Sequence, residues 1–447
     1  MIEWESASAG AEVRKSKTLY IQASAALVQF HLEECYLFAR IRGLFRIPNY
    51  TLFVAGMMLI GIAVSVTSPY LSLYCTRVIG MSTGLFGLFM ACVSLTGVLV
   101  NTILAKYADS GLNRKLVIVA ATACSALGYA SYLVFHEYML MLITVSLLVG
   151  FGAPAVPQIF ASAREAVSAS GRTDSTFANS LLRSLFSLGF LIGPLIGSFL
   201  LLQLGYRGVF LGTSAFFAAV GCCVFFFLHS KQEASPVLNL KRIGPAAGER
   251  TVSLRERRIL LPFLAMILLS MCNTTYNLNI PLFVVNQLGG TESQAGIIIA
   301  LSAGLEIPLM IGLGSLASRF GNRKLMMTGC VLAGIYHILL LNADGLWQVI
   351  AGQLLQASFV SMVVAIGLSY FQDLLPATPG LATILYSNSS TLGSLLGNLT
   401  GGLVAQIAGY RNVYWLCLGL VAVSLALLSR AGRGEKTDEA QPALPLS

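Results

Sequence analysis

Windows of about twenty predominantly apolar residues recur along the chain, and about twenty residues is the length that an α-helix needs to cross a bilayer. The chain has 447 residues, of which 56% are hydrophobic and only 11% are charged. The sequence therefore predicts an all-α integral membrane protein rather than a soluble domain. We expect twelve transmembrane helices, with starts near Tyr50, Gly84, Lys115, Tyr138, Ala178, Arg207, Ile259, Gln294, Lys324, Leu346, Leu381 and Asn412.

A long polar connector divides the twelve windows into two blocks of six. The basic and semi-apolar N-terminus fits either an interfacial helix or a disordered segment. We expect five regions: an N-terminal cytoplasmic extension (1–49), a six-helix bundle (50–229), a cytoplasmic linker (230–258), a second six-helix bundle (259–430) and a cytoplasmic tail (431–447).

The basic residues predict the orientation, because Lys and Arg favour cytoplasmic loops. If both termini are cytoplasmic, only Arg77, Arg207 and Arg411 lie on the opposite face, and Arg183 falls inside the fifth window. The formal net charge of +9 then reflects topology and contact with anionic membrane lipid. We expect no nucleic-acid partner.

The two halves repeat each other. Glycine occurs at every fourth residue over 189–197 in the fifth window and again over 393–401 in the eleventh. Small residues at this spacing let two helices approach closely, so each run predicts a packing seam. The fourth window of each half also ends in a charged turn, Arg164-Glu165 and Gln372-Asp373, which we expect to form matching contacts between helices.

A basic turn follows the second window of each half, and both turns contain Asn-Arg-Lys-Leu, at 113–116 and 322–325. These turns and the six-plus-six arrangement resemble the major facilitator superfamily, whose halves are repeats around a midplane substrate cavity. The second turn departs from the family pattern, because Ser318 stands at the position of its aspartate. The resemblance implies a gating role at the cytoplasmic ends for Asp109, Arg114, Lys115, Arg323 and Lys324.

Four further stretches resemble the bacterial sugar efflux transporters of the Set type: PQIFASARE (157–165), MCNTTYNLNIPLF (271–283), SAGLEIP (302–308) and YFQDLLP (370–376). The resemblance covers most of the chain, from Tyr50 to Ser429. It implies proton-coupled export of small sugars and glycosides, such as lactose, glucose and alkyl glycosides, across a bacterial inner membrane. We expect a monomer without a cofactor.

One carboxylate, Glu306, stands in a segment from Gln294 to Ala317 that holds no other charge. A charge at the bilayer centre costs at least a few kcal/mol, so we interpret Glu306 as functional rather than structural. Burial favours the neutral form of an acid, and Glu306 could therefore carry a proton. Arg183 is the second candidate for proton coupling, although it could instead snorkel to the headgroups. In the superfamily fold these two helices face each other, so the two charges could communicate.

Two clusters of neutral polar side chains suit an uncharged, hydroxyl-rich ligand, because amides both donate and accept hydrogen bonds. Helix-to-helix packing through the same groups is the alternative. We also expect Pro281 and Pro308 to interrupt their helices, as transporter gates often require. The candidate substrate-binding residues are Asn273, Tyr276 and Asn277 on one face of the seventh helix, and Ser387, Asn388 and Thr391 on the eleventh.

Several signals favour no catalytic chemistry. The nine cysteines lack Cys-x-x-Cys spacing, which indicates packing rather than disulfides or a metal site, and His337 on an apolar helix is most simply a packing residue. We find no HExxH, no GxSxG and no P-loop, so neither an enzyme nor an ATP-driven pump is expected. A drug exporter of the same superfamily remains the main alternative. A nutrient sensor is disfavoured because the connector is too short for a signalling domain.

Overall fold

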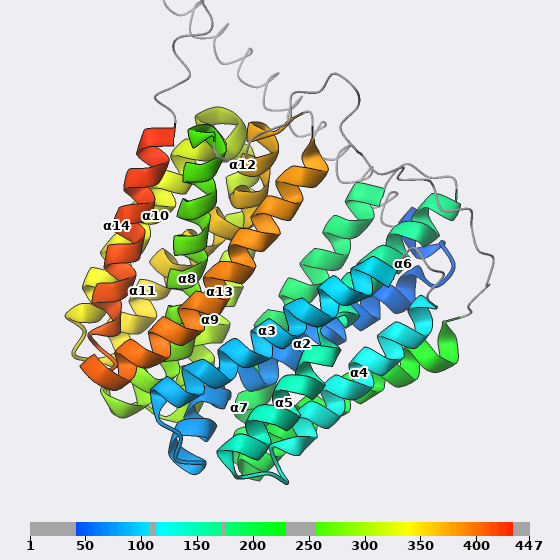
Figure 1. Cartoon of the computed structure of the whole chain (residues 1–447), viewed down its shortest axis with the longest axis horizontal. Coiled ribbons are helices and arrows are strands. Elements are labelled where there is room, and N and C mark those ends of the chain that lie inside the picture. Colours follow the sequence, from blue (N-terminus) through cyan, green and yellow to red (C-terminus); the bar gives the residue numbers. More distant parts are fainter. Residues whose placement is uncertain (1–41, 108–112, 171–174, 229–255, 377, 432–447) are drawn as a thin grey trace, which may run out of the picture.

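The computed structural model describes residues 42–107, 113–170, 175–228, 256–376 and 378–431 (Figure 1). Over these ranges the chain forms helices and no strand, which confirms the predicted all-α class. The predicted extension, linker and tail lie largely outside the described residues. The helices are α2 (Tyr50–Leu73), α3 (Thr83–Tyr107), α4 (Arg114–Ser131), α5 (Tyr138–Gly152), α6 (Ala155–Ala169), α7 (Ser175–Phe227), α8 (Arg257–Asn286), α9 (Glu292–Phe320), α10 (Asn322–Leu341), α11 (Leu346–Ser361), α12 (Gly367–Leu374), α13 (Pro379–Ala408) and α14 (Val413–Ala431), with π-helical segments η1 (Tyr74–Val78) and η3 (Met362–Ile366).

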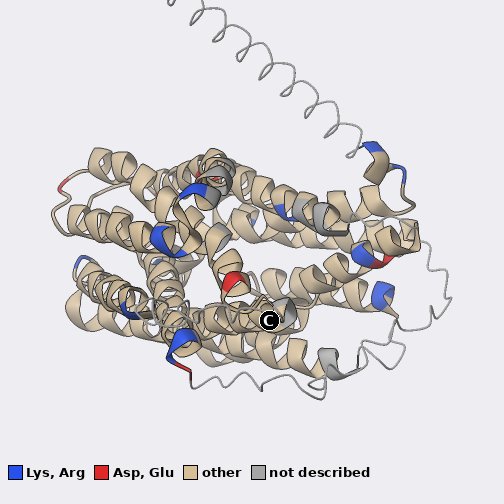
Figure 2. Cartoon of the chain, turned by 90° about the horizontal axis from the view of Figure 1, so that it is seen from above, with Lys and Arg blue, Asp and Glu red and all other residues tan. Residues whose placement is uncertain are grey.

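The outer surface of the helices is apolar, as lipid contact requires. Eight helical stretches among the described residues are long and apolar enough to cross a membrane. Large side chains such as Leu202, Phe226 and Trp347 are about 70% exposed, and Figure 2 shows few charged positions along the ribbon. Such exposure would be a liability in water but is favourable against hydrocarbon. The number of crossings beyond these eight stays a prediction.

The helices gather into two bundles, α2 to α7 and α8 to α14 (Figure 1). Glycine seams hold together one helix pair in each bundle, α2 with α7 and α8 with α13. A Cβ added at Gly197 would lie 2.5 Å from the carbonyl oxygen of Val66, and one at Gly397 would lie 2.6 Å from that of Met271. The backbones therefore touch where the two glycine runs predict close packing, and that prediction is confirmed.

The proline prediction is wrong. α8 continues through Pro281 and α9 continues through Pro308, so neither residue interrupts its helix. A proline removes one backbone hydrogen bond, and a membrane helix tolerates that loss when its neighbours restore the contacts. Inside α7 there is a non-helical residue, Gly205, whose φ of 64° lies in the region that glycine adopts readily. The fifth and sixth predicted windows lie on either side of this glycine.

Matching contacts tie the fourth predicted helix of each half to a basic turn. Arg114 Nη2 donates to Glu165 Oε1 at 2.6 Å in the first bundle, and Asn322 Nδ2 donates to Asp373 Oδ2 at 2.6 Å in the second. The two partners are separated by 51 residues in both cases. The expected contacts of the two charged turns are therefore confirmed, and they support an internal duplication.

The two bundles lie closest at one end. We call the end where α7 stops and α8 starts the connector end, and the opposite end, where α8 stops and α9 starts, the far end. In Figure 1 the bundles converge toward the bottom and diverge toward the top. The contacts described below join the two bundles at the far end, which lies at this convergence (Figure 1).

Candidate functional site

Glu306 lies on α9 beside the contact between the two bundles. Its side chain is half-buried, and its Oε1 accepts a hydrogen bond from Ser302 Oγ at 3.4 Å. Ser361 Oγ donates to the backbone carbonyl of Glu306 at 3.4 Å, which ties this turn of α9 to α11. A Cβ added at Gly304 would lie 3.0 Å from Leu191 Cδ1 of α7, in the other bundle. The expected pairing of the fifth and eighth predicted helices is therefore present, with an acid next to it.

Arg183 lies on the α7 side of the same pairing, nearer the connector end. Its side chain is exposed, and its backbone carbonyl accepts a hydrogen bond from Ser187 Oγ at 3.2 Å. Among the described side chains no salt bridge joins Arg183 to Glu306. Communication between the two charges, directly or through water, stays a prediction.

The candidates on α8 do not share one environment. Asn273 is half-buried, and its Oδ1 accepts a hydrogen bond from Gln356 Nε2 at 3.5 Å, whereas Asn277 is exposed. Tyr276 is only 3% exposed, and its hydroxyl lies 3.1 Å from the Tyr336 hydroxyl. Successive residues on an α-helix are about 100° apart, so Tyr276 can face the bundle interior while Asn277 faces out. The structure thus separates Tyr276 from the two amides with which the sequence grouped it.

The candidates on α13 continue the polar surface of α8. Ser387 and Asn388 are exposed and Thr391 is half-buried, in the connector-side half of the helix. Thr274 Oγ1 donates to Ser394 Oγ at 3.1 Å, which joins the polar stripe of α13 to α8. Since the two helices pack along a glycine seam, the amides of α8 and the hydroxyls of α13 lie on neighbouring elements. They can bind a neutral polar ligand without help from a charge.

Three buried polar residues, Tyr336, Gln353 and Gln356, escaped the sequence analysis. Gln353 Nε2 donates to Tyr336 Oη at 2.9 Å, Tyr276 Oη donates to Gln353 Oε1 at 3.4 Å, and Gln356 orients Asn273. Gln353 and Gln356 are at most 1% exposed. The sequence did offer a signal for the two glutamines, because they stand in an otherwise apolar predicted helix. Polar groups inside a membrane need hydrogen-bond partners, so such residues are expected to contact other helices. These residues form a supporting layer behind the candidate ligand-binding amides.

The supporting layer can be tested through stability. We expect Gln353→Leu to lower the free energy of unfolding by about 1 kcal/mol, because it leaves two tyrosine hydroxyls with fewer partners in a dry core. Thermal unfolding of the purified protein in detergent measures the change. The exposed Gln203→Leu on α7 is the control. An equal melting temperature for Gln353→Leu and wild type would show that the layer contributes nothing to stability.

The candidate gating residues make contacts within their own bundles. Lys115 Nζ lies 5.6 Å from the centroid of the Phe225 ring, and Arg323 donates to the carbonyls of Leu428 and Ser429, both at 2.9 Å. Arg114 binds Glu165, as described above. Lys324 lies in the first turn of α10, and Asp109 lies outside the described residues. Among the described residues of the two basic turns, no hydrogen bond or salt bridge joins one turn to the other, and their gating role stays a prediction.

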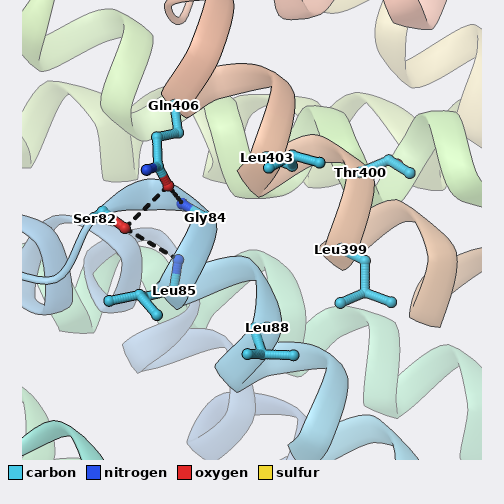
Figure 3. Close-up of a pocket in the computed structure, with 8 residues that line it drawn as sticks. All are labelled: Ser82, Gly84, Leu85, Leu88, Leu399, Thr400, Leu403 and Gln406. Carbon is cyan, nitrogen blue, oxygen red and sulfur yellow. Dashed lines mark hydrogen bonds between the residues drawn. The ribbon is translucent and has the colours of Figure 1, made fainter.

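The far end is held by contacts between the bundles that the sequence analysis did not predict. Arg77 Nη2 donates to Asn286 Oδ1 at 2.7 Å, and Arg77 Nη1 lies 3.9 Å from Glu292 Oε1. Beside them, Gln406 Oε1 accepts hydrogen bonds from Ser82 Oγ and the backbone N–H of Gly84, each at 3.0 Å (Figure 3). The sequence analysis placed Arg77 on the face opposite the cytoplasm but predicted no partner for it. Its partners Asn286 and Glu292 lie in the other half of the chain, more than 200 residues away.

Close backbone packing between α3 and α13 reinforces these hydrogen bonds. A Cβ added at Gly402 would lie 2.5 Å from the Thr83 carbonyl oxygen and 2.8 Å from Gly87 Cα. Deeper in the membrane, Asn398 Nδ2 donates to Ser94 Oγ at 3.4 Å. A groove of about 500 Å³ lies alongside, lined by two leucines from each helix together with Ser82, Gly84, Thr400 and Gln406 (Figure 3). The far end is therefore closed in two ways. Polar contacts join the bundles, and glycines let the backbones of α3 and α13 pack against each other.

The polar far-end contact gives a conformational prediction. We expect Arg77→Met to weaken closure by about 1 kcal/mol, since it removes the hydrogen bonds to Asn286. Spin labels at the exposed positions Val134 and Asn342, one in each bundle, measure the distance across the far end. The population with long label-to-label distances should rise about fivefold relative to wild type.

The matched control for this prediction is Arg207→Met, which removes an exposed arginine from the same end of the first bundle. It should leave the distance distribution unchanged. Equal distributions for Arg77→Met and Arg207→Met would contradict a closing role for Arg77.

The chain is similar to known transporters in both sequence and fold. The Major Facilitator Superfamily pattern matches residues 53–289 and 262–446. Sugar efflux transporter A of Dickeya chrysanthemi is 33% identical over 379 residues, covering 84% of this chain and 94% of that one. Sugar efflux transporter B of Salmonella typhimurium is 32% identical over 384 residues, covering 85% and 95%. The crystal structure of the nucleoside transporter NupG superposes with a TM-score of 0.70 at 17% identity, covering 86% of this chain and 98% of that one.

Proposed function

The chain belongs to the major facilitator superfamily, and we propose that it exports small sugars and glycosides across a bacterial inner membrane in exchange for protons. Its relatives are transporters, so the chain is a transporter and not an enzyme. The observation that carries the substrate class is the set of uncharged amides and hydroxyls on α8 and α13, in a chain 33% identical to a protein named as a sugar efflux transporter. An organic cation would require more acids at this site, and an anion more bases.

We assign the ligand contacts to the accessible members of the two clusters. Asn273, Asn277, Ser387, Asn388 and Thr391 would bind sugar hydroxyls, and Tyr276 would hold the α8 backbone in place through Tyr336. Gln356 donates to Asn273 Oδ1, and the Asn273 Nδ2 group is then free to donate to a hydroxyl of the sugar. This pattern supports a neutral, oxygen-rich substrate.

Proton coupling is assigned to Glu306, with Arg183 as a second charge that tunes it. In the proposed cycle, sugar leaves toward the far side and a proton from that side binds to the Glu306 carboxylate. Neutralising the acid lowers the cost of burying it between the bundles, so the protein can return to the conformation with the far end closed. Deprotonation toward the connector side completes the exchange. Ser302, which donates to Glu306 Oε1, holds the carboxylate in place on α9.

The proposal includes a topology. Twelve crossings with both termini in the cytoplasm place the connector end on the cytoplasmic side, where the basic turns lie. The present conformation would then take up sugar from the cytoplasm, since the far-end contacts are made. On opening, the gating residues Asp109, Arg114, Lys115, Arg323 and Lys324 would close the cytoplasmic side. We expect the unit of transport to be a monomer.

Transport into inverted membrane vesicles tests the function directly. We expect labelled lactose and a labelled alkyl glucoside to accumulate when the vesicle interior is acid, and to equilibrate without accumulation when the gradient is collapsed. Vesicles without the protein are the control. Accumulation of a hydrophobic cation, with no sugar accumulation, would overturn the proposal in favour of a drug exporter.

A further inference from the structure

Three metal-ligating side chains meet in the interior of the second bundle, apart from the candidate sugar site. Cys272 on α8, His337 on α10 and Cys417 on α14 are all 0% exposed. Their ligand atoms lie within 4.8 Å of one another, and Cys272 Sγ lies 3.6 Å from His337 Nε2. The three residues are far apart in the sequence, so they form no metal-binding motif of fixed spacing that the sequence analysis could recognise.

The histidine is oriented as a metal-binding imidazole. His337 Nδ1 lies 2.6 Å from the backbone carbonyl oxygen of Ala333, so Nδ1 carries the hydrogen and donates it. The lone pair of Nε2 then points toward the sulfur atoms. A bond from the second ring nitrogen to a carbonyl is the usual support of a metal-bound histidine. The rings of Tyr336 and Tyr414, with centroids 5.8 and 6.0 Å from the imidazole, hold it in place.

We propose that Cys272, His337 and Cys417 bind a soft divalent cation of the zinc, cadmium and mercury class. A zinc ion with bonds of about 2.3 Å to sulfur and 2.0 Å to nitrogen separates these atoms by about 3.5 Å at a tetrahedral angle. The observed 3.6 Å between Cys272 Sγ and His337 Nε2 already matches that separation. Only a small movement of Cys417 is needed, because no pair of ligand atoms is more than 4.8 Å apart.

Charge selects the divalent class. Two thiolates, one neutral imidazole and a divalent ion sum to zero net charge, which a water-free interior tolerates. A monovalent ion would leave a buried negative charge if both thiols ionised. On binding, two S–H bonds break, two metal–sulfur bonds and one metal–nitrogen bond form, and two protons leave to water. No atom changes its oxidation state.

Such an ion would link α8, α10 and α14. Cys272 directly precedes Asn273, so the link would fix the segment of α8 that carries candidate sugar ligands. The site is nevertheless distinct from the sugar site, and its occupancy can be measured without transport.

Cadmium binding to the purified full chain tests the site. The background is the variant Cys222→Ser/Cys223→Ser, which removes an adjacent pair of cysteines outside the core. We expect one cadmium ion per chain, seen by its ultraviolet thiolate charge-transfer band, with release of two protons into a weakly buffered indicator solution. Cys272→Ser, Cys417→Ser and His337→Gln should each weaken binding by at least about 100-fold.

Cys75→Ser is the matched control, because Cys75 is equally buried in the first bundle. It should leave the affinity unchanged. The proposal is overturned if Cys272→Ser and Cys417→Ser bind cadmium as wild type does, or if one proton is released per ion. It is also overturned if protein produced in cadmium-containing medium carries no bound ion. The last two measurements need no core variant, so they decide the matter even where a substitution prevents folding.

Discussion

Glu306→Gln is expected to abolish proton-driven sugar accumulation, by at least about tenfold, while leaving exchange of sugar across the membrane intact. The substitution keeps the shape of the side chain and mimics its neutral form, so the carrier can reorient but cannot release a proton. The side-chain oxygen of a glutamine at this position can still accept the hydrogen bond from Ser302 Oγ. Paired assays in inverted vesicles, with an imposed pH gradient and with sugar counterflow, separate the two activities.

The control for this result is Glu137→Gln, which neutralises an exposed acid in the loop before α5. It should accumulate sugar as wild type does. Full gradient-driven accumulation by Glu306→Gln would assign proton coupling to another group, and loss of counterflow as well would indicate a structural role for the carboxylate. In either case the proposed substrate class would be decided by the vesicle assay of the wild-type protein. The proposal of sugar export and the proposal of proton coupling through Glu306 can therefore fail separately.

Gly402→Leu is expected to reduce transport by at least about tenfold by preventing closure of the far end. A Cβ at this position would lie within 2.8 Å of Gly87 Cα and 2.5 Å of the Thr83 carbonyl oxygen, and both are backbone atoms that cannot rotate away. Overpacking of this kind costs about 1–3 kcal/mol, or roughly 5- to 150-fold in a conformational equilibrium. The closed state described here would therefore be depopulated.

Labelling distinguishes such a shift from misfolding. In a Ser82→Cys background, Gly402→Leu should react faster with a membrane-impermeant maleimide added from the far side. Gly419→Leu is the control, because a Cβ there meets no atom within 4 Å and the position is exposed. Wild-type transport by Gly402→Leu would mean that α3 and α13 need not approach closely during the cycle.

The candidate site was only partly predictable. The sequence identified Glu306 as an isolated intramembrane charge, and the amides of α8 as neutral polar groups, because each signal is local. It grouped Tyr276 with Asn273 and Asn277 by spacing alone, although Tyr276 is bonded to Tyr336 on α10. Spacing on one helix says which residues are neighbours on its surface, but not which neighbouring helix covers them.

Local physical chemistry determined the class, the all-helical fold and the internal repeat. The length of each apolar segment matches the membrane, an unpaired backbone is excluded from hydrocarbon, and glycine at every fourth residue permits close packing, so each of these properties can be derived from consecutive residues. The tertiary structure alone decided how Arg77 meets Asn286 and how Cys272 meets His337 and Cys417. Those partners come from distant helices, whose relative rotation and depth depend on the packing of the whole bundle, and no single segment encodes that.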